Sequence, residues 1–207
     1  MDAILAISGG KDSTALAHWL HNNPDIDKVY AFMLKLDDTW ESGWEVIKQL
    51  EKEGILTTTE ASLYPQGNST LFMPMEIDTE PQDSINAIRP RRTLIRLLAA
   101  SYGRSLGIHN IYTGIRDGGF STPEFIEYEK QFTKDLARHF RIAGKFRAYV
   151  SEPVFHEPLI GMSVKEAIDF TSATKEIIAK AVPCNHHEIL QSDCAKCNAH
   201  YEWLANL

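Results

Sequence analysis

The chain has 207 residues, 43% of them hydrophobic, which suits one α/β domain with a sizeable core and excludes a disordered protein. The 21 lysine and arginine residues against 28 aspartate and glutamate residues give a net charge of −7, which argues against a nucleic-acid partner and for a small-molecule substrate. No apolar run approaches the ~20 residues of a membrane span, and the sequence starts in an apolar strand rather than a signal peptide. We therefore expect a cytoplasmic protein without a membrane partner.

The first predicted element is a buried strand, Ala3–Ile7, and it leads into the string Ser8-Gly9-Gly10-Lys11-Asp12-Ser13. Helical spacing follows from Thr14 to Leu20. Two glycines let the backbone approach a ligand closely and offer free N–H groups. The start of the helix adds roughly half a positive charge. The stretch predicts a phosphate-binding loop, although it lacks the Walker spacing.

The remaining elements alternate between strands and helices, which predicts a doubly wound, mainly parallel sheet. Residues 62–85 show no sustained period, and so long a loop either covers a site or is a disordered crossover. The expected strands are residues 28–34, 55–61, 110–114 and 146–150. The expected helices are residues 42–54, a helix opened by Arg89-Pro90 and ended by Gly107, a helix from Pro123 to about Gly144, and a helix opened by a capping box, Ser163 to Glu166.

The three cysteines lie in the last 24 residues, and such clustering in a cytosolic chain favours a metal over a disulfide. Together with His200 they supply four thiolate and imidazole ligands, which suits a closed, structural zinc site. Alternatives remain open: His186 or His187 as the nitrogen ligand, free thiols, or a redox pair. We predict an α/β domain at residues 1–183 and a zinc-binding segment at 184–207 packed on it, with the zinc ligands Cys184, Cys194, Cys197 and His200.

The loop resembles the PP-loop of the ATP pyrophosphatases, whose fold is the adenine nucleotide alpha hydrolase-like α/β fold. With its cysteine tail the chain resembles, over most of its length, the 7-cyano-7-deazaguanine synthase (QueC) family. The departures are Lys11 at a usually apolar position, Thr93 in place of an asparagine, a missing segment after the second strand, a shortened segment 117–124 that lacks a cysteine, and His200 in place of a cysteine. The matching stretches are Ser8–Ser13, Pro90–Thr93, Gly114–Asp117 with Pro123–Ile126, Glu157–Lys165 and the tail.

The resemblance implies a ligase that joins 7-carboxy-7-deazaguanine to ammonia and goes on to the nitrile, 7-cyano-7-deazaguanine, while cleaving ATP to AMP and pyrophosphate. It implies Mg²⁺ with the ATP and a structural Zn²⁺, and we expect a homodimer. The implied catalytic residues are Asp12, Arg92 and Lys165; the ATP-binding residues Ile7, Ser8, Gly9, Gly10, Lys11, Asp12, Ser13, Thr14 and Gly114; and the substrate-binding residues Asp117, Phe120 and Glu124.

Other functions and simpler roles for these residues stay open. A sulfur-transfer PP-loop enzyme is disfavoured because residues 1–183 contain no cysteine. A divergent ligase that stops at the amide or uses another carboxylate, and a non-catalytic nucleotide-binding protein, are the other candidates. Arg92 and Lys165 can be solvated surface charges, Glu124 a favourable charge in a helix first turn, and Phe120 a packing residue.

Overall fold

The computed structural model describes residues 1–34, 40–64, 84–116, 123–145, 152–181, 203 and 205–207. Strands and helices alternate along these residues as the sequence predicts. Within these ranges no helix is both long and apolar enough to cross a membrane. In chain order the elements are β1 (Asp2–Ala6), α1 (Lys11–His21), β2 (Lys28–Leu34), α2 (Trp40–Lys52), β3 (Leu63–Tyr64), α3 (Ser84–Ser105), β4 (Asn110–Thr113), α4 (Pro123–Lys145), β5 (Val154–His156), α5 (Val164–Thr171) and α6 (Lys175–Lys180).

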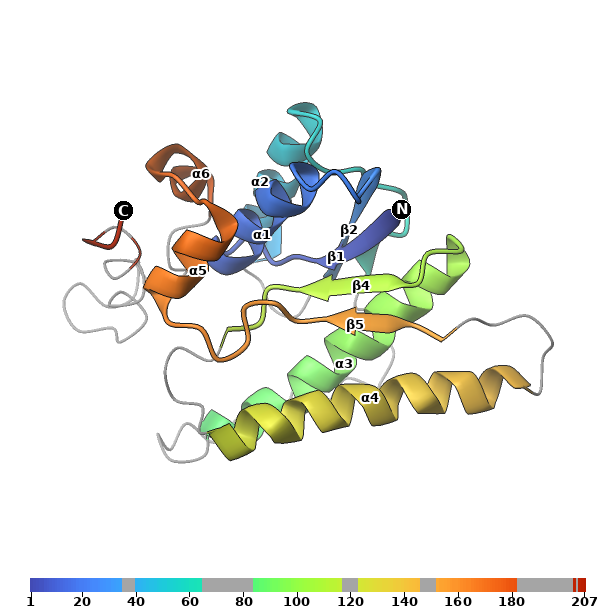
Figure 1. Ribbon diagram of the computed structural model, residues 1–207. Helices are drawn as coiled ribbons and strands as arrows, with labels where there is room; N and C mark the ends of the chain where they lie inside the picture. The colour runs from blue at the N-terminus through green and yellow to red at the C-terminus, as the bar shows by residue number, and fades with distance from the viewer. Residues whose placement is uncertain (35–39, 65–83, 117–122, 146–151, 182–202, 204) are drawn as a thin grey trace.

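The described strands form one five-stranded sheet in the order β3-β2-β1-β4-β5, and every neighbouring pair is parallel (Figure 1). From β1 the chain first builds outward to β2 and β3, and then returns to place β4 and β5 on the other side of β1. The direction of winding therefore reverses between β1 and β4. In open α/β sheets, ligands bind beyond the carboxyl ends of the strands at such a reversal.

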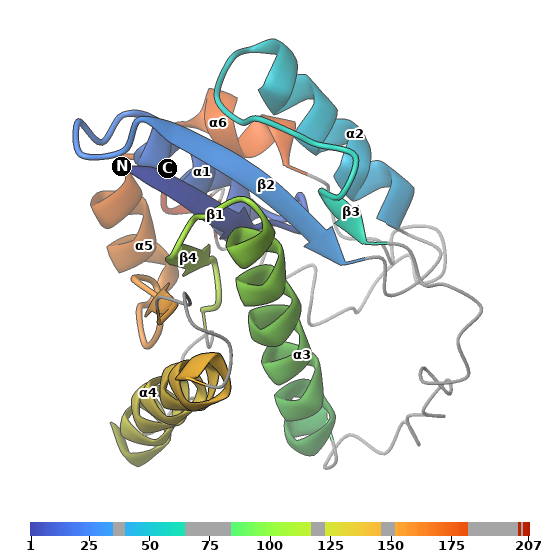
Figure 2. The same cartoon turned by 90° about the vertical axis from the view of Figure 1, so that its right-hand side faces the viewer.

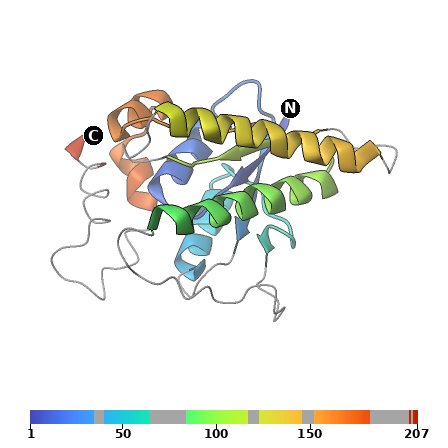
Figure 3. The same cartoon turned by 90° about the horizontal axis from the view of Figure 1, so that it is seen from below.

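Helices cover both faces of the sheet, which confirms the doubly wound prediction. Alternate residues of β1 point to opposite faces: Ala3 and Leu5 belong to the core beneath α1, α2, α5 and α6, and Ile4 belongs to a second core with Ala99 and Tyr102 of α3. Figures 2 and 3 show α3 and α4 together on the face opposite to α1, α5 and α6. Trp203, near the C-terminus, is 1% exposed and belongs to the first core.

Several boundaries match the predictions closely because their signals are local. Strand β2 spans the predicted residues 28–34, and α4 begins at Pro123 as expected. The capping box of α5 is present: the Ser163 hydroxyl accepts a hydrogen bond from the Glu166 backbone N–H, and the Glu166 carboxylate accepts one from the Ser163 N–H at 2.8 Å. Gly107, just past α3, has φ +72°, as a glycine that follows a helix end often does.

The predicted strand at residues 55–61 is wrong. This segment meets β2 only through an isolated bridge between Thr57 and Tyr30, and strand pairing resumes later, at β3. Side-chain oxygens bind its backbone instead: the Thr58 N–H donates to Glu51 Oε1 at 3.0 Å, and the Thr59 N–H donates to Ser62 Oγ at 2.8 Å. Such local hydrogen bonds compete with a sheet ladder.

The start of α3 was also misplaced. The helix begins at Ser84, so Pro90 lies within it rather than at its opening. Pro90 has no N–H, and the helix therefore continues through it with one intrahelical hydrogen bond fewer. The predicted strand at residues 146–150 and most of the long loop at 62–85 lie outside the described residues. Strand β5, only three residues long, was not predicted.

Candidate functional site

The loop between β1 and α1 lies at the carboxyl end of the central strand, beside the reversal in strand order. Gly9 has φ +77°, a conformation that favours glycine. Gly10 is the N-cap of α1, and no side chain caps the helix there. The first-turn N–H groups of a helix have no intrahelical acceptor. The loop therefore directs backbone donors and the positive end of α1 at one point, which is how proteins bind phosphate.

Hydroxyl groups of the same loop hold its shape. Ser13 Oγ donates to the Gly10 carbonyl at 3.0 Å, and Thr14 Oγ1 donates to the Gly9 carbonyl at 3.3 Å. Both side chains are buried, whereas Ser8 is exposed. Because Ser13 and Thr14 already donate within the loop, the structure gives them a part in loop conformation. Ser8 is the hydroxyl residue of the loop that faces solvent.

Two glycines from other elements let the chain pack against this loop. A Cβ on Gly43 of α2 would collide with the Ser8 carbonyl oxygen, and a Cβ on Gly114 would lie 2.8 Å from Ser13 Cα. Such distances essentially never occur in real structures. The residue after β4 and the first turn of α2 therefore touch the loop backbone directly. The loop is therefore held between α2 and the residue after β4, and the contact with Gly114 lies at the reversal of strand order.

An ion pair joins the loop to the segment after β4. Arg116 Nε donates to Asp12 Oδ1 at 2.6 Å, and the two side chains are 6% and 30% exposed. Burial raises the pKa of the Asp12 carboxyl, while the charges of Arg116 and Lys11 oppose that rise. Arg116 and Lys11 thus place two positive charges near the Asp12 carboxylate. The loop combines these cations with a helix N-terminus.

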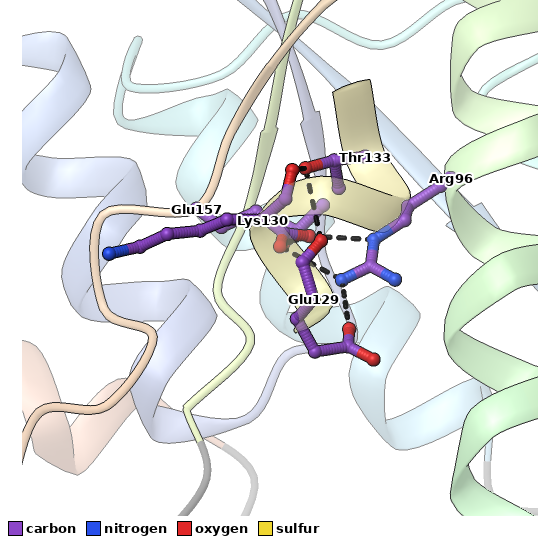
Figure 4. A network of polar contacts seen from close by, with 6 residues as sticks. Arg96, Glu129, Lys130, Thr133 and Glu157 are labelled. Atoms are coloured by element: carbon purple, nitrogen blue, oxygen red, sulfur yellow. Dashed lines mark hydrogen bonds and ion pairs between the residues drawn. The ribbon is translucent and has the colours of Figure 1, made fainter. Parts of the chain in front are cut away.

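A second ionic group lies on the α3 side of β4 (Figure 4). Arg96 of α3 donates through Nε and a terminal amino group to both oxygens of Glu157, each at 2.8 Å, and through a terminal amino group to Glu129 of α4 at 2.6 Å. Thr113, the last residue of β4, donates to Glu157 Oε1 at 3.2 Å. We call Arg96, Glu129 and Glu157 the buried cluster, because their side chains are 1%, 4% and 7% exposed.

The charges of the buried cluster decide its role. Burial alone would lower the pKa of Arg96, but the hydrogen bonds and charges of Glu157 and Glu129 outweigh it and raise the pKa. A guanidinium that binds one carboxylate through two N–H groups is geometrically well matched. The cluster ties α3, α4 and the residue after β5 to the end of β4. It thereby fixes the position from which the chain continues to Gly114 and Arg116.

The family model described as "Queuosine biosynthesis protein QueC" matches residues 2–203. The chain belongs to the QueC family. Membership in the QueC family implies a role in queuosine biosynthesis and the activity of an ATP-using ligase, and it agrees with a phosphate loop at the reversal of a parallel sheet. The resemblance inferred from the loop and the tail is thus confirmed at the level of the family.

The predicted residues of this QueC family member fall into two groups in the structure. The first is assembled: Ile7 to Thr14 form the loop, and Gly114 packs on it. The second is not tested. Lys165 is exposed on α5, Glu124 is exposed on the first turn of α4, and Arg92 lies on α3 with its side chain outside the described part. Asp117, Phe120, Cys184, Cys194, Cys197 and His200 lie outside the described residues, as do His186 and His187.

The described residues contain no group of three or more His, Cys, Asp or Glu side chains that could hold a metal. The zinc prediction rests on residues beyond that part of the chain, and it stays a prediction. For magnesium, Asp12 offers one carboxylate beside the loop. Mg²⁺ usually binds through one or two carboxylates together with substrate phosphates and water. Asp12 therefore fits a magnesium that arrives with a nucleotide.

Sequence reasoning missed three features of the site. Arg116 belongs to a stretch that matches the family, but the sequence assigns it no role. It lies 104 residues from Asp12 in the sequence, and the fold brings the two side chains into contact. Gly43 lies within the predicted helix at residues 42–54, but the sequence alone does not indicate its contact with the loop. The buried cluster was not foreseen, because its residues come from three separate segments. The sequence signal for Arg116 was its position three residues beyond a buried strand at the predicted ligand edge.

Proposed function

We propose that this protein converts 7-carboxy-7-deazaguanine and ammonia into 7-cyano-7-deazaguanine, with two ATP molecules cleaved to AMP and pyrophosphate. The observation that carries the proposal is the phosphate loop, with its uncapped helix start and the buried Arg116 beside it, in a chain that belongs to the QueC family. A carboxylate is a poor electrophile until one oxygen is made into a leaving group. Transfer of adenylate from ATP to that oxygen supplies AMP as the leaving group.

The proposed reaction has two similar halves. In the first, a carboxylate oxygen of the substrate attacks the α-phosphorus of ATP and expels pyrophosphate, and ammonia then displaces AMP to give the amide, losing a proton. In the second, the amide oxygen attacks the α-phosphorus of another ATP and expels pyrophosphate, and loss of AMP and of the amide protons then leaves the nitrile. Each AMP carries away one oxygen of the original carboxylate. No protein nucleophile is needed, so the protein contributes position and charge.

The residues divide this work by their chemistry. The N–H groups of Gly9 and Gly10 and the Ser8 hydroxyl bind the leaving pyrophosphate. Arg92 and Lys165 offset charge that develops on the phosphates. Asp12 would hold the Mg²⁺ that accompanies ATP, directly or through water, and the metal would supply neutralisation of the phosphate charge. Asp117 and Glu124 accept hydrogen bonds from the guanine-like edge of the substrate, and Phe120 stacks on its ring.

The C-terminal segment contributes stability in this proposal. Cys184, Cys194, Cys197 and His200 bind one structural zinc ion, which leaves no open position for catalysis. Purified protein should contain about one zinc per chain by elemental analysis. Cys194→Ala should lose the metal and lower the unfolding temperature. Freshly purified, folded protein without zinc would contradict this part of the proposal.

Mass spectrometry tests the function. The protein is incubated with ATP, Mg²⁺, ammonium and 7-carboxy-7-deazaguanine, and the products are compared with a reaction that lacks ammonium. The proposal predicts the nitrile mass together with AMP and pyrophosphate. The amide mass alone would identify a ligase that stops halfway, as the shortened segment 117–124 allows. No AMP from this substrate would contradict the proposed carboxylate.

A further inference from the structure

Arg116 is a buried cation at the phosphate loop for which the family resemblance supplied no role. It follows β4 by three residues, and Gly114 between them packs directly on Ser13 of the loop. Its side chain is only 6% exposed, and its Nε lies 2.6 Å from Asp12 Oδ1. A charge so far removed from water requires compensation. The carboxylate that compensates it is itself a residue of the loop.

The local charges indicate what else Arg116 can bind. Lys11 and Arg116 contribute two positive charges and Asp12 one negative charge, and Lys11 is close enough to act on the pKa of Asp12. The start of α1 adds roughly half a positive charge, and no side chain caps it. Two cations and a helix start therefore meet at this loop. A ligand that carries several negative charges, such as a polyphosphate, has the chemistry to bind there.

The shape of the guanidinium indicates how that ligand is bound. Arginine has five N–H donors in a planar fork. The contact with Asp12 uses Nε, on one edge of the fork. The terminal amino groups form the edge that pairs with two phosphate oxygens at once. Arg116 can thus keep its bond to Asp12 and still contact a polyphosphate held by the loop.

We propose that Arg116 binds the β- and γ-phosphates of ATP, the part that leaves as pyrophosphate, and that Asp12 is the positioning residue that aims its guanidinium at them. The proposal rests on the proposed function, because it takes ATP as the ligand of the loop. It assigns to the segment after β4 a role in phosphate binding, in addition to the recognition of the substrate. The same contact stabilises the charge that appears on pyrophosphate as it departs.

Isothermal titration calorimetry of the full-length protein tests the proposal, with Mg²⁺ present throughout. The probes are ATP, inorganic pyrophosphate and AMP, and the variants are Arg116→Gln, Arg116→Lys and, as a control, Arg104→Gln. Arg104 is an exposed arginine of α3. Loss of charged hydrogen bonds should weaken ATP and pyrophosphate binding by Arg116→Gln about tenfold to a hundredfold. AMP affinity should stay within about twofold of wild type, and the control should match wild type for every probe.

Arg116→Lys keeps the charge but not the fork, so it should fall between wild type and Arg116→Gln for pyrophosphate. It also keeps the proposal falsifiable if Arg116→Gln does not fold. Wild-type pyrophosphate affinity in either variant would overturn the assignment, as would an equal loss of affinity for AMP, which would mean that Arg116 only tethers the loop. Wild-type protein that binds neither ATP nor pyrophosphate would overturn the proposed function as well.

Discussion

The two ionic groups around β4 have similar chemistry and different surroundings. In the buried cluster one arginine faces two carboxylates, all three side chains are at most 7% exposed, and the sum of charges is −1. At the phosphate loop Arg116 binds the carboxylate of Asp12, which is 30% exposed, and Lys11 adds a second positive charge nearby. One strand links them, since Thr113 contacts the cluster and Arg116 the loop.

The comparison suggests different roles for the two arginines: we expect Arg96 to stabilise the fold and Arg116 to bind a ligand. Arg96 of α3 is enclosed by partners on two other segments, Glu129 of α4 and Glu157 after β5, so it holds α3, α4 and the end of β5 together. Arg116 is paired on one edge and lies beside a helix start that attracts anions. Breaking the first group should therefore cost stability, and breaking the second should cost ligand binding and turnover.

The largest effect is expected at the buried cluster. Arg96→Ala leaves two buried carboxylates without their cation and should lower the free energy of unfolding by about 3–5 kcal/mol. Arg104→Ala on the exposed side of the same helix should change it by no more than about 0.5 kcal/mol. Urea titration monitored by circular dichroism measures both. Equal stability of Arg96→Ala and Arg104→Ala would mean that the cluster does not hold the fold.

The next effect is expected in catalysis. Asp12→Ala removes the carboxylate that aims Arg116 and fits Mg²⁺, so the rate of AMP formation should fall by a factor of about 100 or more, with the fold retained. Asp169→Ala, on the exposed side of α5, is the matched control and should keep full activity. Chromatographic measurement of AMP gives both rates. A folded Asp12→Ala protein with wild-type AMP production would remove Asp12 from the site.

A smaller effect is expected from the packing of α2 on the loop. Gly43→Ala forces the helix away from the Ser8 carbonyl and should cost about 1–3 kcal/mol of stability, together with weaker ATP binding. Ser42→Ala changes the exposed neighbour on the same helix and should leave both quantities close to wild type. Thermal unfolding with and without ATP measures both the stability and the stabilisation by ATP. If ATP raises the unfolding temperature of Gly43→Ala as much as that of wild type, the contact between Gly43 and Ser8 does not determine the shape of the loop.

The smallest effect is expected at the exposed capping box of α5. Ser163→Ala should cost about 1 kcal/mol, whereas Ser101→Ala, an exposed helical serine, should cost less than about 0.5 kcal/mol. Hydrogen bonds from Ser163 hold the pKa of Glu166 below its ordinary value, so their contribution is present at neutral pH and is lost as pH falls through that lowered pKa. Unfolding midpoints at two pH values should show the difference between the variants shrinking in acid. If the difference in unfolding midpoint between the variants is the same at both pH values, the stabilising effect of Ser163 does not depend on the charge of Glu166.

Local signals made much of the fold predictable. The glycine string, Pro123 and the Ser163 box each specify structure within a few residues, and each was placed correctly. The threonine-rich segment after α2 misled the prediction, because β propensity does not reveal that Glu51 and Ser62 oxygens bind its backbone.

The pairs that define the site were beyond local reasoning. Arg96 is 61 residues from Glu157, and Arg116 is 104 residues from Asp12. Only the sheet order brings these segments together, and the sequence predicts the strands without stating which pairs are neighbours. Gly43 was missed for the same reason: its contact partner, Ser8, belongs to another element.

Isotope transfer from the substrate tests the central claim, which is that an oxygen of the substrate attacks the α-phosphorus of the ATP bound at the loop. The measurement uses 7-carboxy-7-deazaguanine with both carboxylate oxygens replaced by ¹⁸O, and mass spectrometry of the AMP formed with Mg²⁺ and ammonium present. The account predicts one ¹⁸O in each AMP and two labelled AMP molecules for every nitrile. AMP without label, or ADP as the nucleotide product, would contradict it.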